Sequence, residues 1–153
     1  LGRVFYAGGD VFEAAADLAE QQAAVSSRDE KSHGHIAMQK YSAGGAREEA
    51  LQGFPTARTG ADSLRDSGDD AHQAMLVILS DIRDTNLLYR GGEDALEYVQ
   101  TTAQELLELP QAKRGDALRA MDRECIARDI SPGGAADMLA LAFLIRDTAK
   151  GYY

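Results

Sequence analysis

Basic side chains are scarce in this chain, and so is cysteine. Lys and Arg together number 16 against 25 Asp and Glu, which gives a formal net charge of −9. Contacts along a nucleic-acid backbone need a surplus of cations, so broad nucleic-acid binding is excluded. The single cysteine, Cys125, excludes an internal disulfide framework and fits a reducing compartment, so we expect a cytoplasmic protein.

Long apolar runs are missing as well. No run approaches the roughly 20 residues of a membrane-spanning helix, so the sequence predicts no membrane partner, and the start, LGRVFYAGGD, lacks the layout of a signal peptide. The chain has 153 residues, 44% hydrophobic and 27% charged, which is ordinary for one globular domain. It has only 3 prolines, no tryptophan and much Ala, Leu, Glu, Asp and Arg, which favours helices.

The spacing of apolar residues predicts an all-α protein of about six or seven packed helices in one domain, residues 1–153, because no segment shows sustained alternation. We expect helices over about residues 10–27, 31–41, 93–109, 115–129 and 132–150. A further long helix should follow the capping residues 67–70. The Gly- and Pro-punctuated residues 42–60 read as a loop around a short turn at 46–51.

The helix after Asp70 carries an aliphatic stripe with i, i+3, i+4, i+7 spacing, namely Met75, Ile78, Leu79 and Ile82. If the helix continues, Asn86 is the next residue on the stripe and points inward. A buried amide without partners costs about 1–3 kcal/mol, so polar groups should meet it, and Asp84 projects from a neighbouring face. The pattern is typical of a cleft wall. The alternative is that Asn86 bonds a carbonyl at a helix end and Asp84 is a solvated C-terminal carboxylate.

The last helix repeats this anomaly. Pro132 stands at its first position, after Ser131 as the cap. Up to Ile145 it is apolar nearly all round, which predicts a central, buried helix. Asp137 nevertheless falls on one line with Leu141, and a buried carboxylate needs a cation or several donors.

Two glycines, Gly133 and Gly134, occupy the first turn of that helix, where each costs about 1 kcal/mol relative to Ala. Their presence suggests that a group approaches the backbone closely, and free N–H groups at a helix start can bind phosphate. The alternative is that the glycines allow tight helix packing and that Asp137 pairs with a structural Arg.

A third polar stretch is GGAREEALQGFPTA, residues 44–57, where Arg47, Glu48 and Glu49 follow two glycines. Alone it is a weak signal, because charged residues in such loops are usually solvated. His33 and His35 would diverge on a helix, so we predict no metal site there. Cys125 is expected to pack in the interior.

Taken together, YSAGGAREEALQGFP, DTNLLYRGG and ISPGGAADMLALAFL resemble the triphosphoribosyl-dephospho-CoA synthases that serve citrate lyase and malonate decarboxylase. The resemblance covers about residues 31–147 and the C-terminal half of the family, while residues 1–30 match nothing assigned. Glu48 stands where the family has glycine, and Ala135 where it usually has serine. Because the family's chain is roughly twice this long, we expect either a fragment or a shortened relative without activity.

The resemblance implies a transferase that joins ATP to 3′-dephospho-CoA and releases adenine, giving triphosphoribosyl-dephospho-CoA. The product would pass on toward an acyl carrier protein. The alternative hypothesis is a non-catalytic helical module derived from this fold, which binds a nucleotide or a protein partner.

The resemblance and the charge that develops on the ribose also suggest site residues. The candidate catalytic carboxylates, whose separate roles stay open, are Glu49, Asp84 and Asp137. Mg²⁺ is the implied metal, with Asp84 and Asp137 as its ligands. The residues expected to bind substrate are Arg47 and Arg90 on phosphates, Asn86 on a sugar hydroxyl or metal-bound water, and Ser131, Gly133 and Gly134 as backbone donors.

Overall fold

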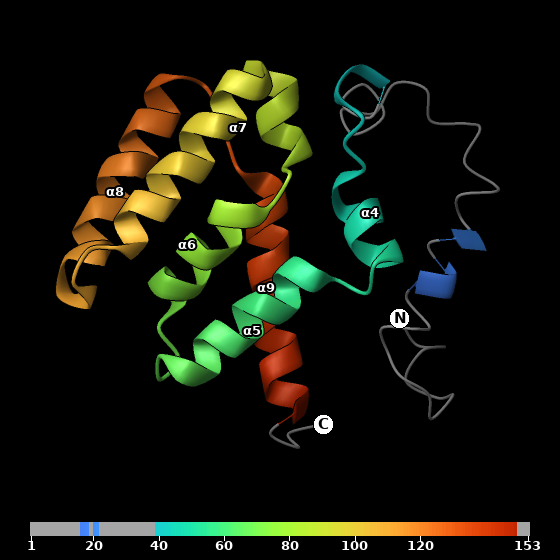
Figure 1. Ribbon diagram of the computed structural model, residues 1–153, viewed down its shortest axis with the longest axis horizontal. Coiled ribbons are helices and arrows are strands. Elements are labelled where there is room, and N and C mark those ends of the chain that lie inside the picture. Colours follow the sequence, from blue (N-terminus) through green and yellow to red (C-terminus); the bar gives the residue numbers. More distant parts are fainter. Residues whose placement is uncertain (1–15, 19, 22–38, 150–153) are drawn as a thin grey trace.

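The computed structural model describes residues 16–18, 20–21 and 39–149 (Figure 1). These residues contain helices and no strands, so the predicted all-α class is confirmed for them. The six helices are α4 (Gly45–Leu51), α5 (Pro55–Asp66), α6 (Ala71–Asp81), α7 (Thr85–Leu107), α8 (Gln111–Ala127) and α9 (Gly133–Ala149). Residues 16–18, 20–21 and 39–41 are also helical, while His33 and His35 lie outside the described residues. Of the described helices, none is both long and apolar enough to cross a membrane.

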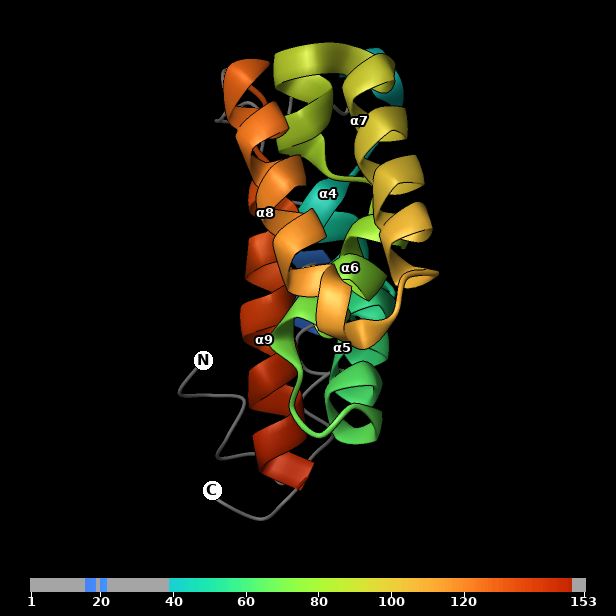
Figure 2. The ribbon, with the colours of Figure 1, turned by 90° about the vertical axis from the view of Figure 1, so that its left-hand side faces the viewer.

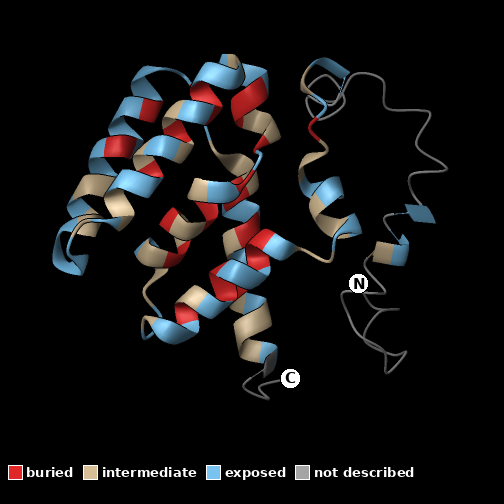
Figure 3. Cartoon of the chain, viewed as in Figure 1, coloured by how far each residue is buried: buried red, intermediate tan, exposed pale blue. Residues whose placement is uncertain are grey.

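Helix α6 lies at the centre of the packed helices, since it contacts α5, α7, α8 and α9. Figure 1 shows α7 and α8 side by side on one side of α6, with α5 crossing α9 on the other. In Figure 2, which is turned by 90°, α8 faces the viewer, with α9 to its left and α7 to its right. The fully buried aliphatic side chains come mainly from α5, α6 and α7 (Figure 3), namely Leu64, Leu76, Ile78, Leu79, Leu87, Leu88 and Val99. Helix α4 lies beside this body rather than within it (Figure 1).

The break between α6 and α7 corrects the expected continuous helix. Helix α6 ends at Asp81, and both Ile82 (ψ 136°) and Asp84 (ψ 116°) have extended backbone. The Asp84 side chain then accepts hydrogen bonds from the N–H groups of Asn86 and Leu87, which is the geometry of an N-cap. Asp84 is therefore a buried start of α7, not a solvated residue at the end of α6. At Gly92 (φ 71°, ψ −164°) α7 kinks and then resumes.

Helix α5 corrects the expected loop over residues 42–60. It begins at Pro55, a residue suited to the first turn because it needs no N–H partner. The preceding Phe54 has left-handed backbone (φ 58°), which makes the turn after α4 tight. The expected turn at 46–51 is confirmed as α4, and α8 begins at Gln111 rather than near 115.

Helix α9 is less buried than its sequence predicted. Only one side, formed by Ala135, Met138 and Ala142, is buried against the rest of the molecule. Leu144 is 37% exposed, and Asp137 is exposed rather than directed inward. The periodicity of a helix that is apolar nearly all round does not tell which side its partners cover. The central position belongs to α6 instead.

Helices α5, α6 and α9 meet at Gly60. A Cβ atom placed there would lie 2.7 Å from Ile78 Cδ1 and 3.2 Å from Ala142 Cβ. We expect Gly60→Val to lower the free energy of unfolding by about 1–3 kcal/mol, because its methyl groups overpack this crossing. Urea denaturation followed by circular dichroism measures the change.

Gly115→Val is the matched control, since Gly115 lies inside α8 and a Cβ there would meet nothing closer than 3.8 Å. We expect its effect to stay below about 1 kcal/mol. Equal losses in the two variants would contradict the tight crossing at Gly60.

Candidate functional site

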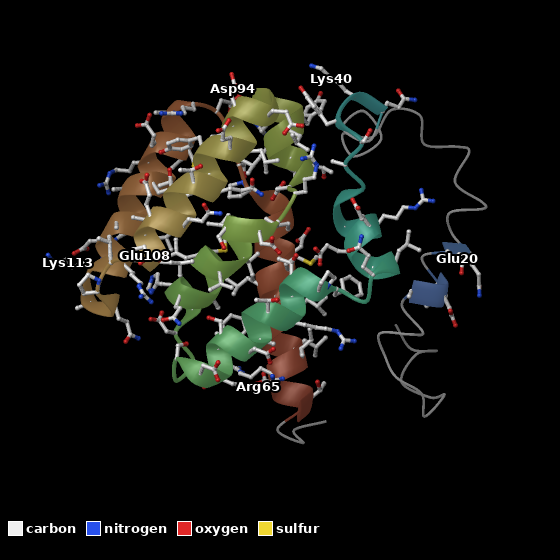
Figure 4. All side chains as sticks on the ribbon, in the orientation of Figure 1. Glu20, Lys40, Arg65, Asp94, Glu108 and Lys113 are labelled. Carbon is white, nitrogen blue, oxygen red and sulfur yellow. The ribbon has the colours of Figure 1, made fainter. Side chains whose placement is uncertain are left out.

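The three polar stretches singled out in the sequence meet in space at the starts of α4, α7 and α9. A Cβ on Gly45 would lie 2.7 Å from Thr85 Cγ2, and a Cβ on Gly133 would lie 2.5 Å from Asn86 Nδ2. Figure 4 shows side chains of α4 and of the helical body extending toward one another in this region. The starts of these helices thus lie close together although 40 residues separate the first from the second and 48 separate the second from the third.

Asp84 joins two of these helix starts. Its Oδ1 accepts hydrogen bonds from Asn86 N at 2.8 Å and Leu87 N at 3.3 Å, while Oδ2 accepts one from Ala135 N at 2.9 Å. The residue is only 1% exposed, and this burial raises the pKa of its carboxyl. Hydrogen bonds from the backbone of both helix starts, that of Ala135 foremost, act in the opposite direction. The carboxylate is enclosed by backbone donors, which makes it a structural link.

The same contacts explain the two glycines at the start of α9. A Cβ on Gly134 would lie 3.0 Å from Asp84 Oδ2, and Gly133 faces the Asn86 amide. The groups that approach this backbone are therefore side chains of the α7 start. Asn86 is half-buried there and does not point into an aliphatic stripe, contrary to the expectation from periodicity. These contacts agree with tight packing at the glycines, which is one part of the alternative stated above.

A polar cavity of about 190 Å³ lies where α4, the start of α5 and the end of α6 meet. It is lined by Gly45, Glu48, Glu49, Gln52, Pro55, Thr56, Asp81, Ile82 and Arg83. Glu49 is half-buried, and its two carboxylate oxygens accept hydrogen bonds from the backbone N–H of Thr56 (3.1 Å) and from its hydroxyl. The carboxylate is therefore fixed at the wall of a cavity large enough for polar atoms of a ligand.

The arginines lie around this cavity at different places. Arg83 lines it, donates to Tyr41 O at 3.0 Å and pairs with Glu93 at 2.7 Å. Lys40 precedes Tyr41 in the sequence, and Asp94 follows Glu93. Figure 4 shows Lys40 and Asp94 at the same end of the molecule. Arg47 is exposed and lines a neighbouring, wider cavity of about 490 Å³, which Glu48 shares. The two cavities thus lie on adjoining sides of α4.

Other predicted site residues lie outside both cavities. Arg90 forms an exposed ion pair with Asp129 at 3.2 Å, and both Ser131 and Asp137 are exposed. Asp137 and Asn86 therefore do not face a shared interior hollow. Across the described parts of the chain, no three His, Cys, Asp or Glu side chains gather closely enough to hold a metal ion.

The cavity also contains residues that the sequence analysis did not select, namely Thr56 and Asp81. A signal for Thr56 was present, because Pro55 is a typical first residue of a helix. It predicts a first turn whose N–H groups are free to bind Glu49. Asp81 carried no such signal, since its proximity to α4 depends on the break after α6.

The sequence model of the family described as ATP:dephospho-CoA triphosphoribosyl transferase matches residues 4–152. The chain belongs to this family. It is similar to the 2-(5''-triphosphoribosyl)-3'-dephosphocoenzyme-A synthase of Escherichia fergusonii, with 42% identity over 72% of this chain and 40% of that protein. A probable synthase of Pseudomonas fluorescens is 39% identical over 74% of this chain and 43% of that protein.

This member of the transferase family spans about two fifths of the length of the curated relatives it matches. No solved structure matches it at a significant level. The family assignment agrees with the resemblance carried by the three polar stretches, which are the segments that the structure brings together.

We expect Asp84→Asn to lower the free energy of unfolding by about 1–3 kcal/mol, although the two side chains have the same shape. An amide can still accept from Asn86 and Leu87 through its oxygen. Its NH₂ group, however, would face the N–H of Ala135 and leave that buried donor unpaired. Thermal and urea denaturation measure the loss.

Asp70→Asn is the matched control, because Asp70 caps α6 through Oδ1 and accepts from Gln111 Nε2 at 2.9 Å through Oδ2. The Gln111 amide can turn to present its oxygen, so we expect a loss below about 1 kcal/mol. A larger loss in Asp70→Asn than in Asp84→Asn would contradict the role of Asp84.

Proposed function

We propose that this chain forms part of the active site of an enzyme that transfers the triphosphoribosyl group of ATP to 3′-dephospho-CoA and releases adenine. The family assignment supports the reaction type. The observation that carries the proposal is the fixed Glu49 carboxylate at the wall of the polar cavity. The product would then pass on toward an acyl carrier protein.

The reaction breaks the bond between C1′ of the ATP ribose and N9 of adenine. The bonding electrons leave with adenine, which takes up a proton, and C1′ forms a bond to a ribose hydroxyl oxygen of dephospho-CoA, which loses its proton. Positive charge develops on the sugar during this exchange, and a nearby carboxylate stabilises it. Of the three carboxylates predicted from the sequence, Glu49 alone lines one of the described cavities. We therefore assign it to the reacting sugar or to the departing proton.

Mg²⁺ enters this proposal as part of the ATP substrate, because triphosphate carries Mg²⁺ in solution and hard cations prefer oxygen ligands. Asp84 does not fit a metal ligand, since it is 1% exposed and both oxygens accept backbone hydrogen bonds. Asp137 is exposed, so its oxygens are open to a metal-bound water. No step of the reaction is assigned to the metal.

Arg47 is the residue we assign to the phosphates. It lines the wider cavity next to the one that holds Glu49, and no ion pair joins it to another described residue. A guanidinium without a carboxylate partner retains all its donors for phosphate oxygens. Arg90, paired with Asp129, remains a weaker candidate for the same role.

A second function is favoured by the charge of the polar cavity. Glu48, Glu49 and Asp81 line it against one cation, Arg83, and this balance disfavours a bare triphosphate. Of the two ligands expected for a non-catalytic helical module, a protein partner is more consistent with this charge than a nucleotide.

We expect the chain to release adenine from ATP only when dephospho-CoA and Mg²⁺ are both present, which chromatography of the reaction mixture measures. Addition of the part of a full-length relative that this chain does not match, as a second polypeptide, should raise the rate if such residues contribute to the site. ATP binding without any adenine release, even with that addition, would favour the non-catalytic module.

In an active preparation we expect Glu49→Gln to lower the rate of adenine release by about 10²–10⁴-fold. The amide preserves both contacts, because its oxygen accepts from Thr56 N and the Thr56 hydroxyl accepts from its NH₂ group. Stability should therefore be unchanged while the charge is lost. Glu105→Gln, an exposed change on α7, controls for the loss of one negative charge. A rate unchanged in Glu49→Gln would exclude Glu49 from the chemistry.

A further inference from the structure

A second cavity of different character lies between α6, α8 and the segment before α9. Its volume is about 280 Å³, and its floor is formed by Met75, Leu79, Leu118, Met121, Cys125 and Pro132. Three exposed polar side chains, His72, Arg119 and Asp122, form its rim. A mostly apolar hollow with a few polar groups at its mouth is the usual form of a small-molecule site.

This cavity adjoins the place where the polar stretches meet. Pro132 lines it, and the next residue, Gly133, faces the Asn86 amide. Helix α6 contributes to both cavities, with Leu79 on the apolar one and Asp81 on the polar one. Residues two apart on a helix point to different sides, so α6 separates the two cavities.

The size of the cavity limits its occupant. A volume of 280 Å³ is below the roughly 300–1,000 Å³ of sites that enclose a whole drug-sized ligand. The apolar floor would leave the phosphate oxygens of a nucleotide without partners. The cavity suits the narrow, uncharged end of a longer molecule.

We propose that this cavity binds the thiol end of the pantetheine arm of dephospho-CoA and thereby distinguishes the two substrates. This assignment rests on the proposed function. ATP and dephospho-CoA share adenosine and phosphates, so arginines and polar cavities recognise both. Only dephospho-CoA carries a long uncharged arm that ends in two methylene groups and a sulfur atom. Met75, Met121 and Cys125 offer polarizable, adaptable surroundings for such an end, while the rim offers partners for the amides of the arm.

Cys125 provides the measurement, because it is the single cysteine of the chain, is 5% exposed and lines the cavity floor. Its modification by dithiodipyridine, a small uncharged disulfide, reports on access to the cavity. Burial raises the pKa of this thiol, so the reaction is measured at alkaline pH to keep it fast. The ligands are S-methyl dephospho-CoA, S-methyl pantetheine and ADP, none of which consumes the reagent.

We expect S-methyl dephospho-CoA to slow the modification about tenfold when present at roughly ten times its Kd. S-methyl pantetheine should do the same at higher concentration, and ADP should have no effect. Equal protection by ADP and S-methyl dephospho-CoA would overturn the assignment, as would no protection by either pantetheine compound at millimolar concentration.

The two proposals fail separately. Adenine release from ATP and dephospho-CoA without protection of Cys125 would remove the cavity assignment and leave the proposed function. Protection without adenine release would leave the cavity assignment and point to a chain that binds dephospho-CoA but does not catalyse the transfer.

A substitution tests the same point from the protein side. Leu118→Trp fills the cavity from α8, and we expect it to weaken the binding of S-methyl dephospho-CoA at least tenfold while ATP binding stays unchanged, both measured by calorimetry. Ile126→Trp adds similar bulk to α8, but Ile126 is 69% exposed and lies outside the cavity lining. Weaker binding of S-methyl dephospho-CoA in both variants, or in neither, would contradict the assignment, and thermal denaturation checks that both are folded.

Discussion

The arrangement of the candidate site depends on one buried carboxylate, Asp84, that caps α7 and also accepts the N–H of Ala135 near the start of α9. Helix starts repel one another electrostatically because each carries partial positive charge, and an anion placed between them offsets this repulsion. The link seats Thr85 against Gly45 and Asn86 against Gly133. The proximity of the α7 and α9 starts thus depends on this contact, and the residue after Asp84 faces α4 at Gly45.

Two of the candidate acidic residues, Asp84 and Glu49, therefore have different roles. Asp84 is enclosed and satisfied by backbone donors, and its contribution is to position helices. Glu49 is held by Thr56 but still lines a cavity, and its contribution is chemical in the proposed function. A polar residue within an apolar pattern indicates that a partner must exist. It does not tell whether the partner is a ligand or the backbone of another helix.

Much of the fold follows from local signals, and the rest depends on contacts that are distant in the sequence. The periodicity of residues 93–109 and the capping group before α6 predicted helices correctly. Pro55 correctly indicated the start of α5, but the glycines around it favoured the prediction of a loop. The break before Asp84 had one local signal, because Asp is a preferred N-cap residue, but neither Gly nor Pro marks the break and Ile82 continues the apolar stripe. The partner of Asp84 lies 51 residues further along the chain. The exposure of Asp137 likewise depends on which side of α9 its neighbours cover.

Under the proposed function, the two cavities on either side of α6 give this transferase a polar and an apolar recognition surface. Its substrates are both adenine nucleotides, so electrostatic recognition of phosphate attracts either one to either position. Discrimination must come from the part that differs, which is uncharged, and burial of each methylene group contributes about 0.8 kcal/mol. Two buried methylene groups together contribute about 1.6 kcal/mol, which favours one substrate somewhat more than tenfold, and burial of the sulfur atom adds to this. An apolar cavity next to Gly133 supplies that difference without adding charge to a site that already holds three acidic residues.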